Sequence, residues 1–170
     1  MTEEYWDLLD AHRRPLERTW RRGLPLEAGA YHVVVMVLTV NARGELLLTL
    51  RDANKESHPG KWEVTAGSVL AGERSVEAAV RELREETGIE VNAAALDLLG
   101  SRLERSAFID IYLLRHDAPI ESLRMQAGET TAAQWADFDT VQGHVADGTM
   151  AAPVVARLRH VEGALLRALA

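Results

Sequence analysis

Three glutamates at close helical spacing are the residues of this chain best suited to chemistry. Glu82, Glu85 and Glu86 stand at i, i+3 and i+4, so on a helix they share one arc of roughly 100°. Like charges at these spacings repel one another. A hard divalent cation turns this repulsion into a net attraction, because Mg²⁺ and Mn²⁺ favour carboxylate oxygens together with substrate phosphates. The spacing therefore indicates a metal-binding site, although glutamates alone are also typical of a solvated surface helix.

A longer pattern around the glutamates favours the metal-binding site. Residues 67–89 read GSVLAGERSVEAAVRELREETGI, which fits G-x5-E-x7-R-E-[apolar]-x-E-E-x-G-[apolar] throughout. This segment resembles the Nudix box of the Nudix hydrolase superfamily and departs from it nowhere. The matching residues are Gly67, Glu73, Arg81, Glu82, Leu83, Glu85, Glu86, Gly88 and Ile89.

The resemblance implies a hydrolase that cleaves a phosphoanhydride bond with bound Mg²⁺ or Mn²⁺. Glu82, Glu85 and Glu86 would hold the ions, together with the backbone carbonyl of Gly67, where a glycine lets the main chain approach closely. Such a reaction needs charge neutralisation on phosphate oxygens and an oriented water. The implied substrate is a small molecule in which a nucleoside diphosphate is linked to another moiety.

Arg81 and Glu73 have a supporting part. Arg81 precedes Glu85 by four residues, so its guanidinium can brace that carboxylate while it pairs with Glu73. An ordinary surface ion pair contributes little to stability. Because the spacing matches the box, we expect this pair to orient the metal-binding carboxylates.

Two acids outside the box are further candidates. Glu129 stands before Trp135 in the arrangement E-x5-W, which resembles the late glutamate that gives many Nudix hydrolases a metal ligand or general base. The same position also suits a solvated loop residue. Asp110 interrupts an apolar strand, where alternation points it towards the metal or towards solvent. The general base is therefore Glu129, Asp110 or a box glutamate.

Substrate contacts are expected from basic and aromatic residues near the box. The basic candidates for phosphate binding are Arg51, Lys55, Arg102 and Arg105. The aromatic candidates for stacking on a base are Trp62, Phe108 and Tyr112. Aromatic residues in strands more often belong to the core, and Arg51 also suits a simple strand end.

Composition restricts the class of protein. A chain of 170 residues with 47% hydrophobic residues suits one domain with a substantial core. The net charge of −7 argues against a nucleic-acid partner. No cysteine is present, which excludes disulfides, zinc–thiolate sites and thiol catalysis. The N-terminus lacks an apolar signal core, and the longest apolar run, residues 33–38, is too short for a bilayer. We therefore expect a cytoplasmic protein with no membrane partner.

The box must be positioned by strands on either side of it. Residues 31–40 are rich in β-branched types and predict a central strand. A turn at 41–44 and a return strand at 45–51 form a hairpin with it. A short strand at 62–65 leads into the box, whose helix begins with Ser75 as N-cap and stops at Gly88. Its buried face should hold Val76, Val80, Leu83 and Thr87, with the glutamates exposed.

The remaining chain predicts fewer elements. Residues 95–105 carry the chain to a strand at 107–115, and a polar loop at 117–131 precedes a last strand at 133–138. Pro153 opens a terminal helix at 154–168. Helices on both faces of the strands predict an α/β fold, a three-layer α/β/α sandwich with a mixed sheet, as the family resemblance also implies.

The chain is expected to form a single domain over residues 1–170. Residues 1–30 form an N-terminal β-hairpin-like appendage, with strands at 5–9 and 16–20. The catalytic core covers 31–140, and a helical segment covers 141–170. We predict that residues 4–29 help form a homodimer.

Two other functions fit parts of the sequence. Residues 31–115 partly resemble isopentenyl-diphosphate isomerase, but that enzyme has a cysteine before the box glycine and a histidine after it. This chain has Ala66 and Ser68 there. A non-catalytic nucleotide-binding member usually lacks a box glutamate or carries a DNA-binding domain, and neither applies. Hydrolysis is the favoured prediction.

Overall fold

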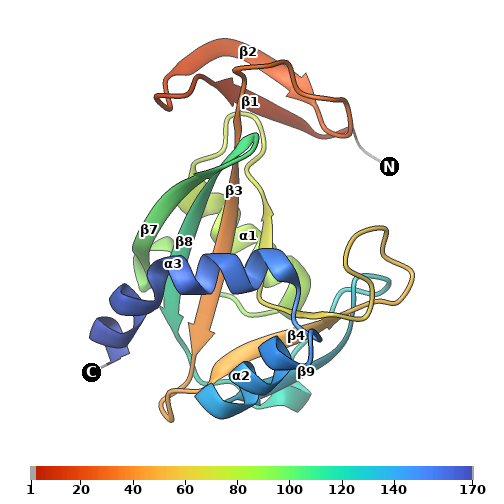
Figure 1. The fold of residues 1–170 in the computed structure, drawn as a ribbon, viewed down its shortest axis with the longest axis vertical. Helices are drawn as coiled ribbons and strands as arrows, with labels where there is room; N and C mark the ends of the chain where they lie inside the picture. The colour runs from red at the N-terminus through yellow and green to blue at the C-terminus, as the bar shows by residue number, and fades with distance from the viewer. Residues whose placement is uncertain (1–2, 170) are drawn as a thin grey trace.

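A seven-stranded mixed sheet lies at the centre of the protein (Figure 1). The computed structural model describes residues 3–169. Only β3 and β8 pair in parallel, and the other paired strands of this sheet are antiparallel. The strands are β3 (His32–Val40), β4 (Leu46–Arg51), β5 (Trp62–Glu63), β6 (Ala66–Ser68), β7 (Leu96–Glu104), β8 (Ala107–Arg115) and β9 (Thr130–Ala136).

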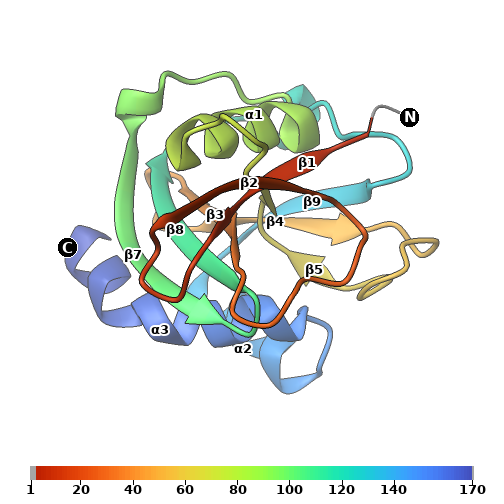
Figure 2. The same ribbon diagram turned by 90° about the horizontal axis from the view of Figure 1, so that it is seen from above.

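Helices cover both faces of the sheet (Figure 2). Helix α1 (Ser75–Thr87) lies on one face, and α2 (Phe138–Ala146) and α3 (Ala152–Leu169) lie on the other. Alternation along β3 separates two apolar clusters, because Val35 and Val37 pack towards α1 while Met36 and Leu38 pack towards α3. The predicted three-layer sandwich is confirmed. Two short 3₁₀ helices complete the described chain, η1 (Ala93–Ala95) and η2 (Ile120–Ser122).

The N-terminal hairpin forms a separate two-stranded sheet at one end of the molecule (Figure 1). Its strands, β1 (Tyr5–Leu9) and β2 (Pro15–Arg21), are those predicted from the sequence. Leu9 and Tyr31 exchange two backbone hydrogen bonds, of 2.8 and 2.9 Å. The Trp6 ring stacks on His32 with ring centroids 3.8 Å apart. Burial lowers the pKa of His32 to about 4, so this imidazole is neutral at physiological pH.

Four elements differ from the sequence prediction. The strand expected at 62–65 is only Trp62–Glu63, and a separate strand follows at Ala66–Ser68. Residues 95–105, expected as a connection, contain strand β7, and β9 begins at Thr130 rather than at 133. Helix α2 overlaps the helical segment expected at 141–170 but was not predicted as a separate element, because its short sequence FDTVQGHVA contains a glycine and several weak helix formers. In the region 3–169 no helix is both long enough and apolar enough to cross a membrane.

The box helix has the predicted length but a different N-cap. Arg74 occupies the N-cap position, and its backbone N–H donates to the Glu77 carboxylate at 2.9 Å. Ser75 is the first helical residue, and its hydroxyl donates to Asp110 at 2.5 Å instead of capping the helix. At the other end Gly88 has a φ of 73°, the left-handed conformation expected of a glycine that ends a helix.

Candidate active site

A split in the sheet brings the box residues together. Strand β3 pairs with β4 only at Val40, and further along the same edge it pairs with β6. Strand β4 continues beside β5 and β9. Because β6 occupies the edge that β4 leaves, Gly67 lies opposite Val35 at the level of α1.

Gly67 lies too close to Glu82 for any side chain. A Cβ atom built on Gly67 would lie 2.0 Å from both Cδ and Oε1 of Glu82. Such a separation is far below van der Waals contact. The sequence explained Gly67 by a close approach of its main chain to a metal, and the structure adds a close approach to a carboxylate.

Gly67→Ala is therefore expected to displace Glu82 and to lower turnover by about 10²-fold, since a misplacement of ~1 Å at a reacting centre can cause such a loss. The measurement is kcat with saturating metal, alongside a thermal unfolding curve to confirm folding. Gly143→Ala is the matched control, because a Cβ at Gly143 in α2 meets no atom within 4 Å. Full turnover by Gly67→Ala would contradict the importance of this contact.

Arg81 connects the box residues to one another. Its Nε and Nη2 atoms each donate to Glu73 at 2.9 Å, and Nη1 donates to Glu82 at 2.8 Å and to Glu85 at 3.3 Å. Nη2 also donates to the Ser68 carbonyl at 3.0 Å. The bridge from Glu73 to Glu85 has the geometry expected from the sequence. The bond to Glu82 was not foreseen, because neighbouring residues i and i+1 on a helix do not face each other.

Arg81→Ala is expected to raise the metal concentration needed for half-maximal activity by about 10- to 100-fold, the usual effect of losing a residue that orients metal ligands. Arg81→Lys should recover little of the lost metal affinity, because one ammonium group cannot bind Glu73 and Glu82 at the same time with the geometry of a guanidinium. Arg84→Ala is the control, since Arg84 is exposed on the same helix. If Arg81→Ala needs no more metal than the wild type, the ion pairs of Arg81 do not orient the metal ligands.

The acidic face of α1 is more buried than the sequence suggested. The Glu82 side chain is 15% exposed, whereas the Glu85 side chain is 42% exposed. Burial raises the pKa of Glu86 well above its ordinary value, and the charges of Glu63 and Glu82 raise it further. Burial also raises the pKa of Glu82, against the opposing effect of Arg81. The expectation of an exposed face is thus wrong for Glu82 and Glu86, because this edge of α1 faces β5 and β6.

Glu63 is a residue of this region that the sequence did not single out. Its carboxylate oxygens each accept a hydrogen bond of 2.8 Å from Arg51 Nη1, and burial raises its pKa. Alternation of side chains in the strand before the box could have identified Glu63. Trp62 packs towards α2, so its neighbour must face α1.

Glu129 joins the same region from the start of β9. Lys55 donates to it at 2.5 Å, and the Glu129 carbonyl accepts from the Asp52 N–H at 2.8 Å. The charges of Lys55 and Glu129 both act on the pKa of Glu63. The loop after β4 therefore brings Lys55, and with it Glu129, to the vicinity of Glu63.

Asp110 is excluded from the acidic cluster. It is 2% exposed and accepts hydrogen bonds from Arg13 and from the hydroxyls of Ser75 and Ser101. These hydrogen bonds occupy both oxygens of the Asp110 carboxylate. The suggestion that Asp110 acts as ligand or base is wrong, since alternation pointed it neither to metal nor to solvent but to a side chain from the hairpin.

The aromatic candidates lie mainly in the core. Tyr112 is 6% exposed and its hydroxyl donates to Ser75 at 3.0 Å, so the predicted stacking of Tyr112 on a base is contradicted. Phe108 is buried as well. The Trp62 ring lies 5.3 Å from the His144 ring, on the face opposite Glu63, and its contact with substrate stays a prediction.

Arg102 and Arg105 lie away from the glutamates. Arg102 donates to the Ala156 carbonyl of α3 and pairs with Glu104. Arg105 occupies the turn between β7 and β8 with a φ of 37°. Neither residue is brought to the box.

The donor set fits a hard divalent cation by its chemistry. The carboxylates of Glu82, Glu85 and Glu86 offer the oxygen ligands that Mg²⁺ prefers, and like charge from Glu63 and Glu82 lies near Glu86. In their present conformations no three such side chains within residues 3–169 converge on one point. Arg81 binds only one oxygen of Glu82 and one of Glu85, so the second oxygen of each carboxylate is left for an ion.

Known proteins resemble this chain in sequence and in fold. A sequence profile of the NUDIX domain matches residues 30–158. The uncharacterised Nudix hydrolase lmo0368 of Listeria monocytogenes is 36% identical over 138 residues, which cover 78% of this chain and 79% of that protein. The crystal structure of DR0079 from Deinococcus radiodurans superimposes with a TM-score of 0.77 at 26% identity, covering 93% of this chain and 99% of the other. A bifunctional NMN adenylyltransferase/ADP ribose pyrophosphatase from Francisella tularensis shares the fold at 16% identity, with a TM-score of 0.61 and coverage of 86% and 44%.

Proposed function

The chain belongs to the Nudix hydrolase family, whose members cleave diphosphate bonds, and from this premise we propose that it is a Mg²⁺-dependent pyrophosphohydrolase. Its substrate in this proposal is a nucleoside diphosphate linked to another moiety. The observation that carries the proposal is the packing of Gly67 against Glu82, with Arg81 holding Glu82 and Glu85 beside the half-buried Glu86.

The charge balance of the site supports a requirement for metal. Its carboxylates are Glu63, Glu73, Glu82, Glu85, Glu86 and Glu129, and its cationic side chains are Arg51, Lys55 and Arg81. This excess of negative charge repels a diphosphate, and the repulsion is strongest where the groups are desolvated. Binding of substrate therefore depends on added cations.

In this proposal Glu82, Glu85, Glu86 and the Gly67 carbonyl hold Mg²⁺ or Mn²⁺. The ion supplies charge neutralisation on the phosphate oxygens and lowers the pKa of a water. Glu73 and Arg81 hold the carboxylates in place. Glu129 acts as a further ligand or as the general base, and a box glutamate is the alternative base.

Two cations of the site are candidates for phosphate contacts. Arg51 is held by Glu63 and by the Ser57 carbonyl at 2.9 Å. Lys55 is held by Glu129. Each can exchange its carboxylate for a substrate phosphate once a metal ion neutralises that carboxylate, so we propose that both orient the diphosphate.

The test is a turnover panel with Mg²⁺, run with and without chelator. It includes ADP-ribose, sugar nucleotides, dinucleoside polyphosphates, oxidised deoxynucleoside triphosphates and prenyl diphosphates. Metal-dependent hydrolysis of at least one compound is expected. Binding without turnover across the panel would support a nucleotide-binding module instead, and isomerisation of isopentenyl diphosphate would support the isomerase.

The homodimer predicted through residues 4–29 stays a proposal. The hairpin forms its own two-stranded sheet at one end of the molecule (Figure 1), where Tyr5, and Leu24 in the connection after β2, leave apolar surface exposed. We expect a dimeric mass by light scattering. A monomeric mass at high protein concentration would reject the dimer.

A further inference from the structure

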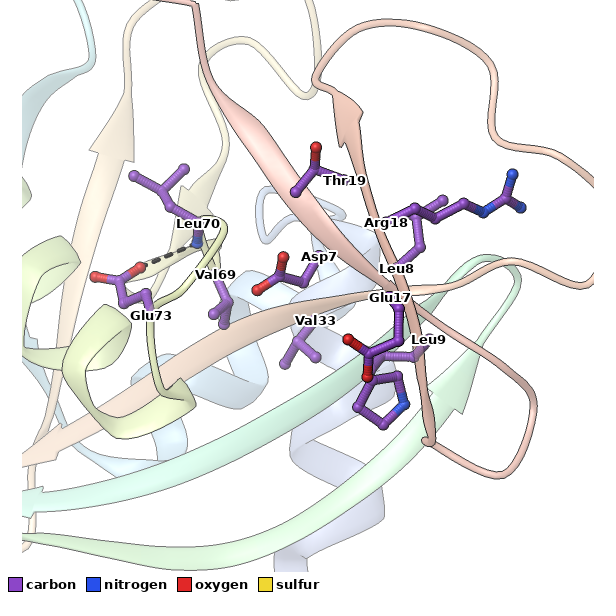
Figure 3. Close-up of a pocket in the computed structure, with 11 residues that line it drawn as sticks. Asp7, Leu8, Leu9, Glu17, Arg18, Thr19, Val33, Val69, Leu70 and Glu73 are labelled. Atoms are coloured by element: carbon purple, nitrogen blue, oxygen red, sulfur yellow. Dashed lines mark hydrogen bonds between the residues drawn. The ribbon is translucent and has the colours of Figure 1, made fainter.

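A cleft of about 690 Å³ lies between the N-terminal hairpin and the core (Figure 3). Pockets that enclose small molecules commonly measure about 300–1,000 Å³. Its lining is apolar at Leu8, Leu9, Val33 and Val69, and polar at Asp7, Glu17 and Thr19. None of the functions proposed above uses this cleft.

The walls of the cleft are fixed before any ligand arrives. On one side the Ala71 N–H donates to the Tyr5 carbonyl at 2.8 Å, and the Gly72 N–H donates to Asp7 at 2.7 Å. On the other side Arg13 holds the hairpin turn to the buried Asp110. A ligand therefore binds without ordering the hairpin, which favours affinity.

The cleft adjoins the proposed metal site. Glu73 lines the cleft and also holds Arg81, which reaches Glu82. Residues 67–70 connect the two places, because Gly67 faces Glu82 while the Leu70 N–H donates to Glu73 at 3.0 Å. Four residues span at most about 10 Å. A sugar and a diphosphate bridge that separation, so a group attached to a diphosphate at Glu82 can reach the cleft.

The carboxylates of Asp7 and Glu17 are acceptors and both residues are exposed, whereas the exposed Thr19 hydroxyl can donate as well as accept. Asp7 uses one carboxylate oxygen for the Gly72 N–H, and among residues 3–169 no side chain pairs with Glu17. The one cation of the lining, Arg18, is bound to Glu27 at 2.6 Å. An apolar lining with free carboxylates disfavours a phosphate. It favours a flat, uncharged group that carries N–H donors.

We propose that this cleft binds the nucleobase of the substrate and selects a base with an exocyclic amino group. The inference rests on the proposed function, which supplies the diphosphate that tethers the base. Asp7 and Glu17 accept hydrogen bonds from the amino group, and the apolar residues contact the ring. A base with an oxo group in that place presents an acceptor to carboxylates and is rejected.

Filling the cleft is the first test. Thr19→Trp is expected to raise KM for ADP-ribose or another nucleotide substrate by about tenfold or more without a matching loss of kcat, as for a binding contact shared by ground and transition states. The affinity for methylene diphosphonate with Mg²⁺, which lacks a base, should not change. Arg21→Trp is the control, because Arg21 lies on the same strand outside the lining. Equal KM values in the two variants, or a loss of diphosphonate binding in Thr19→Trp, would overturn the proposal.

Selection of the amino group is the second test. The wild type should prefer ADP-ribose over the hypoxanthine analogue by about tenfold in kcat/KM, and Glu17→Gln should reduce that preference. No preference, or a preference that survives Glu17→Gln and Asp7→Asn together, contradicts the assignment.

Adenosine binding separates this inference from the proposed function. If no compound is turned over, the hydrolase proposal fails, but the cleft can still be tested by titrating adenosine into the wild type and recording amide NMR shifts. Shifts confined to the hairpin and residues 69–73 support the cleft. Shifts elsewhere, or none, overturn it.

Discussion

Glu86→Gln is expected to lower turnover by about 10³-fold and, at the same time, to stabilise the metal-free protein. The loss of activity follows from removing a carboxylate that we propose to hold Mg²⁺, since metal stabilisation of transition-state charge amounts to several kcal/mol. The gain in stability follows from the position of Glu86 in the fold. Burial raises its pKa well above the ordinary value, and Glu63 and Glu82 add like charge nearby.

The sign of the stability change depends on pH. In the unfolded chain Glu86 ionises near pH ~4.3, whereas the folded protein keeps the proton to higher pH. Ionisation is therefore disfavoured in the fold, and the stability of the wild type falls as the pH rises between the two pKa values. Glutamine removes this penalty.

Thermal unfolding in chelator measures this prediction. At pH ~7.5 the Tm of Glu86→Gln should exceed that of the wild type, and the difference should disappear below pH ~4. Added Mn²⁺ should raise the Tm of the wild type more than that of the variant. Glu85→Gln is the control for the Tm, because the Glu85 side chain is 42% exposed. Near wild-type turnover, or a lower Tm in chelator, would contradict the assignment of Glu86.

Arg13→Ala is expected to destabilise the protein by about 3 kcal/mol, because it leaves the Asp110 carboxylate buried and without its cation. Asp110 is 2% exposed, and Arg13 donates to both of its oxygens. The Arg13 side chain is itself 37% exposed, which places the effect at the lower end for such pairs. Losing the pair should also free the hairpin, so limited proteolysis within residues 3–29 should become faster.

Acid provides an independent check on this ion pair. Burial alone would raise the pKa of Asp110, but the hydrogen bonds from Arg13, Ser75 and Ser101 outweigh it and lower the pKa. The pair therefore contributes stability above pH ~3.9, and this contribution is lost as the pH falls through the lowered pKa of the folded state.

A double substitution separates the charge from the packing at this position. Arg13→Met with Asp110→Asn should recover much of the stability lost in Arg13→Ala, because replacing both members of a buried pair is often nearly neutral. The measurement is urea unfolding of the wild type and of both variants at neutral pH. Equal stability of Arg13→Ala and the wild type would show that the pair does not hold the hairpin.

The elements predicted correctly are those with strong local signals. Gly88 after an amphipathic run ended the box helix, and the β-branched residues 32–40 gave the central strand. The contact between Arg81 and Glu73 was also predicted, because both lie in one continuous motif. Local spacing is sufficient in these cases.

The residues that were missed depend on contacts between distant segments. Arg13 and Asp110 are 97 positions apart, and no pattern in either strand indicates the other. Ser75 looked like a cap because sequence shows only its neighbours, while its actual partner comes from β8. Glu63 was missed because its role depends on β5 facing α1, which the split of the sheet decides.

Anomalous diffraction from crystals soaked in Mn²⁺ with a non-hydrolysable diphosphate tests the proposed metal site most directly. The predicted result is a strong anomalous peak within coordination distance of the Glu82 and Glu86 carboxylates and the Gly67 carbonyl. A substrate analogue bound with no anomalous peak beside these glutamates would contradict it.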